Sequence, residues 1–97
     1  MKKCNSLTEV RQEIDKIDSQ LVELISERSH LVRQAASFKN SIDEVKADDR
    51  MDFIIQKVRH KAIELGVSPN MISELFTIMI NDMVELEIAE FRNSGKF

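Results

Sequence analysis

The stretch that decides the fold is LTEVRQEIDKIDSQLVELISERSHLVRQAASFK, residues 7–39. Its apolar residues recur at alternating steps of three and four, the pattern of an amphipathic helix that packs on other helices. They are Leu7, Val10, Ile14, Ile17, Leu21, Leu24, Leu31, Ala35 and Phe38. Ser6 followed by Glu9 matches a capping box, and neither glycine nor proline interrupts the run. We therefore predict one helix over residues 6–40.

The length of this helix has a consequence for assembly. At about 1.5 Å per residue, the quoted stretch would be roughly 50 Å long. A domain of about 100 residues has a radius of gyration near 13 Å. One chain therefore cannot cover the whole apolar face, and we expect a second chain to cover the rest.

Two shorter helices follow. Residues 41–49 are polar and acidic and are predicted to form a loop. An apolar stripe predicts a helix over 49–65, which Gly66 ends, and Ser68-Pro69 starts another over 69–92. The stripe of the helix over 49–65 consists of Met51, Ile54, Val58, Ala62 and Leu65. The stripe of the helix over 69–92 consists of Ile72, Leu75, Phe76, Met79, Ile80, Met83, Glu87, Ile88 and Phe91. The prediction is an all-α fold of three helices in a single domain, residues 1–97.

Composition excludes several classes of protein. The 97 residues carry a net charge of −3 without a basic block, which argues against nucleic-acid binding. No apolar run is long enough for a membrane span or a signal peptide, so we expect a cytoplasmic protein. Cys4 is the single cysteine, and His30 and His60 are isolated, so we expect no metal or cofactor.

Two ionisable residues occupy positions where the stripes call for apolar ones, namely Arg28 and Glu87. Lys39 follows Arg28 by 11 residues, so in one helix both would share a face about 16 Å apart. Arg11 would point about 100° away and lie roughly 25 Å along the axis from Arg28. In an antiparallel dimer Arg11 could instead reach the partner's cations, while Arg50 could bend back over the same place. The hypothesis is a pocket of three or four cations for an anion with two carboxylates.

Each of these residues also has a purely structural interpretation. Arg28 could pair with an acid such as Glu87 and fix helix register. Lys39 near a helix C-terminus is favourable to the helix dipole without any ligand. Arg11 could pair with an acid four residues away on its own helix.

These residues resemble the all-helical chorismate mutases and their relative, isochorismate-pyruvate lyase. The resemblance rests on VRQEIDKIDSQLVELISER at 10–28, FK at 38–39, Arg50 opening a helix, and LF at 75–76 followed eleven positions later by Glu87. It covers nearly the whole chain. It implies an intertwined homodimer in which the long helices pair and each active site takes one arginine from the other chain.

The resemblance also implies a role for each site residue. Arg11 of the partner chain and Arg28 would hold the two carboxylates of the substrate. Lys39 would bind a carboxylate and the ether oxygen of the enolpyruvyl group. Arg50 would close over the substrate, and Glu87 would contact the ether oxygen from the opposite side.

Three positions depart from the mutase pattern or match it incompletely. Met51 stands where mutases commonly have a glutamate that holds the ring hydroxyl, and the lyase also has an apolar residue there. Met83 replaces a small polar residue of some mutases, and Asp48 lies near where mutases place another hydroxyl-binding acid. Glu87 departs from the lyase instead, which like some mutases has glutamine there.

The activity that the resemblance implies is the Claisen rearrangement of chorismate to prephenate. It needs no cofactor, nucleophile or proton shuttle. Glu87 could assist only when protonated; burial would raise its pKa and nearby Arg28 and Lys39 would lower it. Alternatives are isochorismate-pyruvate lyase, a dual activity, and a non-catalytic helical dimer that binds a carboxylate metabolite.

Overall fold

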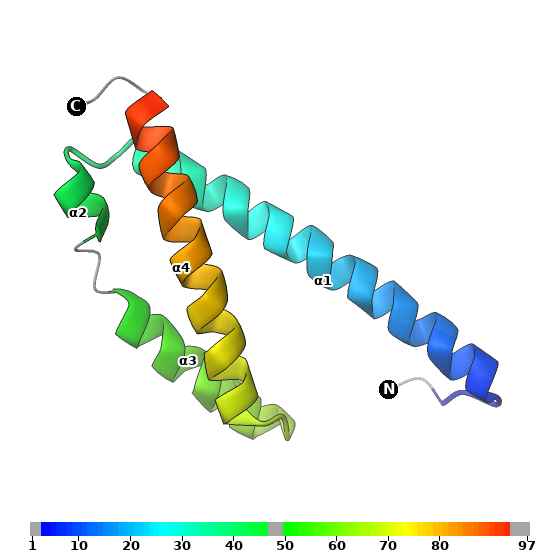
Figure 1. Cartoon of the computed structure of the whole chain (residues 1–97). Coiled ribbons are helices and arrows are strands. Elements are labelled where there is room, and N and C mark those ends of the chain that lie inside the picture. Colours follow the sequence, from blue (N-terminus) through cyan, green and yellow to red (C-terminus); the bar gives the residue numbers. More distant parts are fainter. Residues whose placement is uncertain (1–2, 47–49, 94–97) are drawn as a thin grey trace. The chain divides into compact units, whose positions relative to one another are not determined.

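The computed structural model describes residues 3–46 and 50–93, and within them every regular element is a helix (Figure 1). The elements are α1 (Leu7–Ala36), α2 (Ile42–Lys46), α3 (Arg50–Leu65) and α4 (Pro69–Asn93). The predicted all-α class is confirmed, with α2 as an additional short helix. The chain divides into two compact units, residues 1–31 (unit 1) and residues 32–97 (unit 2).

Unit 1 is the first part of α1, and its start is fixed by local hydrogen bonds. The Ser6 Oγ accepts a bond of 3.1 Å from the backbone N–H of Glu9. The Glu9 Oε2 accepts one of 3.1 Å from the N–H of Asn5. The first bond satisfies an N–H group that the helix leaves without an internal partner, and the second fixes the residue before the Ser6 cap. The Ser6–Glu9 pair thus forms the predicted capping box, with Glu9 bonding the N–H of Asn5 rather than that of Ser6.

The apolar stripe of α1 is exposed in the single chain. Of all the residues of α1, Ala36 alone is buried. The exposed stripe residues are Leu7 (63%), Val10 (38%), Ile14 (49%), Ile17 (55%), Leu21 (51%), Leu24 (59%) and Leu31 (64%). We call these seven residues the α1 seam. An exposed apolar face of this length is characteristic of a surface that another protein segment covers.

The end of α1 differs from the prediction, because the helix stops at Ala36 rather than near residue 40. The Ser37 hydroxyl donates a bond of 2.7 Å to the carbonyl of Gln34, the group that would accept from Phe38 in a continuing α-helix. Phe38 and Lys39 instead bond to Ala35 and Ala36, at 3.0 and 3.2 Å. Lys39 therefore lies beyond the helix, and the prediction that it shares a helical face with Arg28 is wrong.

The predicted loop over 41–49 contains the helix α2, so that prediction is wrong for residues 42–46. A second capping box starts α2. The Ser41 Oγ accepts a bond of 3.0 Å from the N–H of Glu44, and the Glu44 Oε2 accepts one of 3.0 Å from the N–H of Asn40. Val45 anchors α2 on α4, because it is 1% exposed in a core cluster with Ala36, Ile88 and Phe91.

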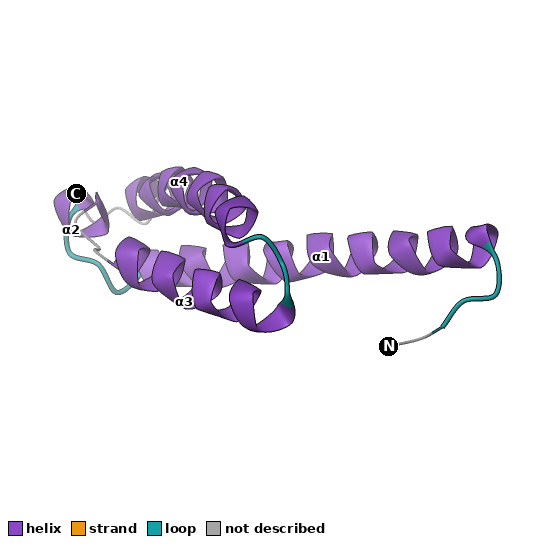
Figure 2. Ribbon diagram, turned by 90° about the horizontal axis from the view of Figure 1, so that it is seen from below, coloured by secondary structure: helices purple, strands orange, loops and turns teal. Residues whose placement is uncertain are grey.

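Helices α3 and α4 form a helical hairpin and lie side by side (Figures 1 and 2). Gly66 ends α3 with a φ of 73°, a conformation that glycine adopts without steric cost. The N–H of Val67 then bonds at 2.9 Å to the carbonyl of Ala62. Ser68 caps α4 by accepting a bond of 3.2 Å from the N–H of Met71, and Pro69 is the first helical residue. The predicted stop and restart are both confirmed.

Candidate functional site

Glu87 is the one charged or polar residue in the buried class among the described residues, at 7% exposed. It lies on α4 one turn after Met83, which is 4% exposed, and directly before Ile88. Its Oε1 atom is enclosed by the protein. Burying a carboxyl group is costly unless it is paired or hydrogen-bonded, so Glu87 departs from the apolar character of the rest of this helix face.

Lys39 lies in the turn between α1 and α2 and is half-buried. Ala36, three residues before it, and Val45, six residues after it, are each 1% exposed and belong to one core cluster with Ile88 and Phe91 of α4. Both ends of the segment that carries Lys39 are thus packed on the part of α4 that follows Glu87. This cluster brings two residues far apart in sequence to the same end of unit 2.

Three further predicted residues belong to unit 2. Arg50 is exposed and opens α3, as the sequence predicted. Met51 follows it and is half-buried. Met83 lies on the buried face of α4 with Glu87. Asp48, the other hydroxyl-binding candidate from the sequence, lies outside the described residues.

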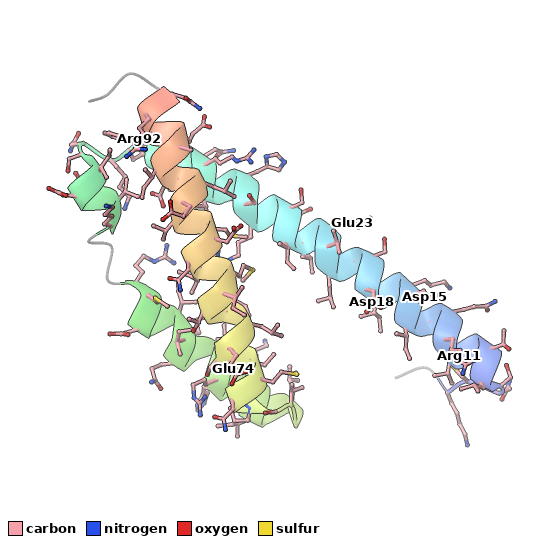
Figure 3. All side chains as sticks on the ribbon, viewed as in Figure 1. Arg11, Asp15, Asp18, Glu23, Glu74 and Arg92 are labelled. Atoms are coloured by element: carbon pink, nitrogen blue, oxygen red, sulfur yellow. The ribbon has the colours of Figure 1, made fainter. Side chains whose placement is uncertain are left out.

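The two predicted arginines of α1 belong to unit 1. Arg28 is half-buried, although its neighbours on the α1 seam are exposed. Arg11 is exposed and projects from the second turn of α1 (Figure 3). It precedes Ala36 by 25 residues in one continuous helix, which corresponds to roughly 38 Å along the axis.

Residues 3–46 and 50–93 contain no group of three metal-ligating side chains that could hold an ion. No helix within these ranges has the length and apolar character required to span a membrane. His60 lies on the surface, where its Nε2 is 3.4 Å from the Glu64 Oε1 one turn later.

Sequence reasoning missed the role of residues 40–44 in forming the turn beside Lys39. The signal was present, because NSLTE at 5–9 and NSIDE at 40–44 share the pattern Asn-Ser-x-x-Glu. The first copy predicts the start of α1, and the second starts α2 immediately after Lys39. Both copies make the same pair of bonds.

The half-buried Lys39 and the buried Glu87 are thus the two ionisable predicted residues whose segments meet at this core cluster of unit 2. The chain belongs to the chorismate mutase type II family, whose family model matches residues 10–88.

Two characterised relatives extend this finding. A chorismate mutase from Methanocaldococcus jannaschii is 30% identical over 94 residues, covering 93% of this chain and 95% of that protein. An isochorismate pyruvate lyase from Pseudomonas aeruginosa is 26% identical over 91 residues, covering 94% of this chain and 90% of that protein. The family resemblance predicted from the sequence is confirmed.

Proposed function

We propose that this protein is a chorismate mutase that converts chorismate to prephenate. The observation that carries the proposal is the burial of Glu87 beside the core cluster that anchors the Lys39 turn. In a chorismate mutase, a lysine and a protonated acidic residue at one end of the hairpin could contact the ether oxygen of the substrate from opposite sides. The match over residues 10–88 includes both of them.

The reaction is pericyclic, so the protein needs no nucleophile. One C–O bond breaks while one C–C bond forms within the same molecule, and no proton or electron is exchanged with the protein. Catalysis then consists of holding the reactive conformer and of stabilising negative charge that develops on the ether oxygen. Lys39 supplies a positive charge there. Glu87 supplies a hydrogen bond only when protonated, because a carboxylate would repel the developing charge.

The two substrate carboxylates require cations. We assign them to Arg28 and Arg50 of one chain and to Arg11 of a second chain. Lys39 contacts the nearer carboxylate as well as the ether oxygen. Met83, buried one turn before Glu87, contributes an apolar wall on the same helix face.

We infer that the working form is an intertwined homodimer. The α1 seam leaves seven large apolar side chains 38–64% exposed in one chain. Burying the remaining surface of each would stabilise the assembly by about 1 kcal/mol per side chain. A second copy of α1 has the same three-and-four spacing, which suits helix-to-helix packing of the two seams.

An antiparallel pairing of the two α1 helices also gives Arg11 a function. Within its own chain Arg11 lies roughly 38 Å along the helix from Ala36. In the antiparallel pair, the N-terminal turns of one α1 lie near the C-terminal turns of the other. Arg11 would then enter the partner's site.

The experiment that tests the function is a turnover assay with chorismate and isochorismate in parallel. Prephenate from chorismate is the expected product. Salicylate with pyruvate from isochorismate would identify a lyase. Saturable binding with neither product would identify a non-catalytic carboxylate-binding dimer and overturn the proposal.

A lyase or a dual activity is the second candidate, and one observation favours it. Met51 is apolar and half-buried, so it cannot accept a hydrogen bond from a ring hydroxyl as a glutamate there would. Met51→Glu supplies that acceptor. If Met51 weakens mutase activity, this variant should increase prephenate formation relative to salicylate formation. An unchanged ratio of the two products would show that Met51 does not determine which substrate is used.

A further inference from the structure

We propose that Ser41 and Glu44 are positioning residues for Lys39. Their capping box at the start of α2 fixes the backbone from which the Lys39 side chain reaches the substrate. This inference rests on the proposed role of Lys39. It assigns a function to two exposed residues that do not themselves contact the reacting atoms.

The hydrogen bonds of this box begin at the residue after Lys39. The N–H of Asn40, which belongs to the peptide bond formed by the carbonyl of Lys39, donates to the Glu44 Oε2 at 3.0 Å. The N–H of Glu44 donates back to the Ser41 Oγ at 3.0 Å. On the other side, the N–H of Lys39 donates to the carbonyl of Ala36 at 3.2 Å. The backbone of Lys39 is therefore restrained from both directions.

The length of α2 makes this restraint depend on its cap. The helix has five residues, so few bonds within it offset the entropy of ordering its backbone. Val45 anchors the helix in the core cluster and Ile42 packs against that cluster. Between Lys39 and Ile42, the cap supplies the hydrogen bonds from Asn40 N–H to Glu44 and from Glu44 N–H to Ser41. A displacement of about 1 Å at a catalytic group can cost about 100-fold in rate. The cap residues should therefore affect catalysis more than their exposure suggests.

The chain offers a matched control in Ser68. It is also an exposed serine cap, and its Oγ accepts a bond of 3.2 Å from the N–H of Met71 three residues later. It caps the far end of α4, which lies roughly 28 Å along the helix from Glu87. Ser41→Ala and Ser68→Ala thus remove the same kind of bond near the proposed site and far from it.

The kinetic test compares kcat, KM and thermal midpoint for Ser41→Ala, Glu44→Ala, Glu44→Gln and Ser68→Ala. We expect Ser41→Ala and Glu44→Ala to lower kcat about tenfold with KM nearly unchanged, because the lost interaction acts in the transition state. Glu44→Gln keeps an acceptor oxygen and should retain kcat. Ser68→Ala should lower the midpoint similarly and leave kcat intact. Equal kcat in Ser41→Ala and Ser68→Ala would overturn the proposal.

A second readout does not depend on turnover. Trypsin cleaves after lysine, and the Lys39–Asn40 bond contains the N–H that Glu44 holds. We expect cleavage at this bond to be about fivefold faster in Glu44→Ala than in the wild type, and unchanged in Ser68→Ala. Equal rates in the wild type and Glu44→Ala would refute the positioning role alone. A wild-type chain without turnover would instead refute the proposed function.

Discussion

The guanidinium group of Arg59 on α3 donates a hydrogen bond of 2.6 Å to the hydroxyl group of Ser73 on α4. The same nitrogen, Nη1, lies 3.1 Å from the carbonyl oxygen of Pro69 and 3.1 Å from the Oδ1 of Asn70. The Ser73 hydroxyl donates in turn to the carbonyl of Pro69 at 2.9 Å. One side chain of α3 thus ties down the first turn of α4.

Arg59→Ala should lower the free energy of unfolding by about 1–3 kcal/mol, because it removes bonds from a charged donor to partly buried acceptors. Denaturant unfolding monitored by circular dichroism measures this. Lys57→Ala is the control, since Lys57 is exposed on the same helix. If both variants unfolded at the same denaturant concentration, the tie would contribute nothing to stability.

Lys39→Ala should lower kcat/KM by about 100- to 1,000-fold, since in the proposed mechanism it removes the positive charge beside the ether oxygen where negative charge develops. Circular dichroism should show unchanged helicity because the side chain is only half-buried. Lys46→Ala removes an equal charge from the exposed end of α2 and should retain activity. Near-normal turnover in Lys39→Ala would exclude this lysine from the mechanism.

The pH dependence of turnover should report on Glu87. In the proposed role its protonated form assists the ether oxygen and its ionised form opposes it, so activity should be full below the pKa of Glu87 and fall as the pH rises through it. Glu87→Gln does not titrate and should keep its activity to neutral pH and above. Glu85→Gln, at an exposed position of α4, should retain the wild-type profile. A flat wild-type profile combined with an inactive Glu87→Gln would contradict this role.

The proposed contribution of Arg11 in trans predicts complementation between two inactive variants. Arg11→Ala and Lys39→Ala should each be nearly inactive alone. When they are unfolded and refolded together, half of the dimers are mixed and each has one intact site, so about a quarter of wild-type activity should return. If Arg11 acted within its own chain, no site in the mixture would be intact and no activity would return.

Local signals predicted most of the fold. Gly66, Ser68 and Pro69 fix the α3–α4 turn through backbone conformation and capping, which depend only on neighbouring residues. The end of α1 was harder to predict. The Ser37 hydroxyl takes the carbonyl of Gln34 from the next backbone N–H, and the apolar stripe, which runs on to Phe38, gives no sign of this competition.

The candidate site was predicted less completely. Its position on an apolar stripe predicted that Glu87 would be buried, and it is. The approach of the Lys39 turn to α4 depends on a core cluster formed by residues from three helices, which no local pattern reveals. Helix periodicity placed Lys39 within the long helix, whereas it lies in the segment between α1 and α2. Only the family resemblance related it to Glu87.

The proposed pairing of two α1 seams has a consequence for folding, which should then depend on protein concentration. Because a second copy would cover the apolar face, the equilibrium between folded and unfolded chains should shift with total protein, and the melting temperature should rise as the sample is concentrated. Extreme dilution would then inactivate the enzyme without any change in sequence or solvent. Specific activity measured at nanomolar levels would consequently understate the activity of the protein in a concentrated solution.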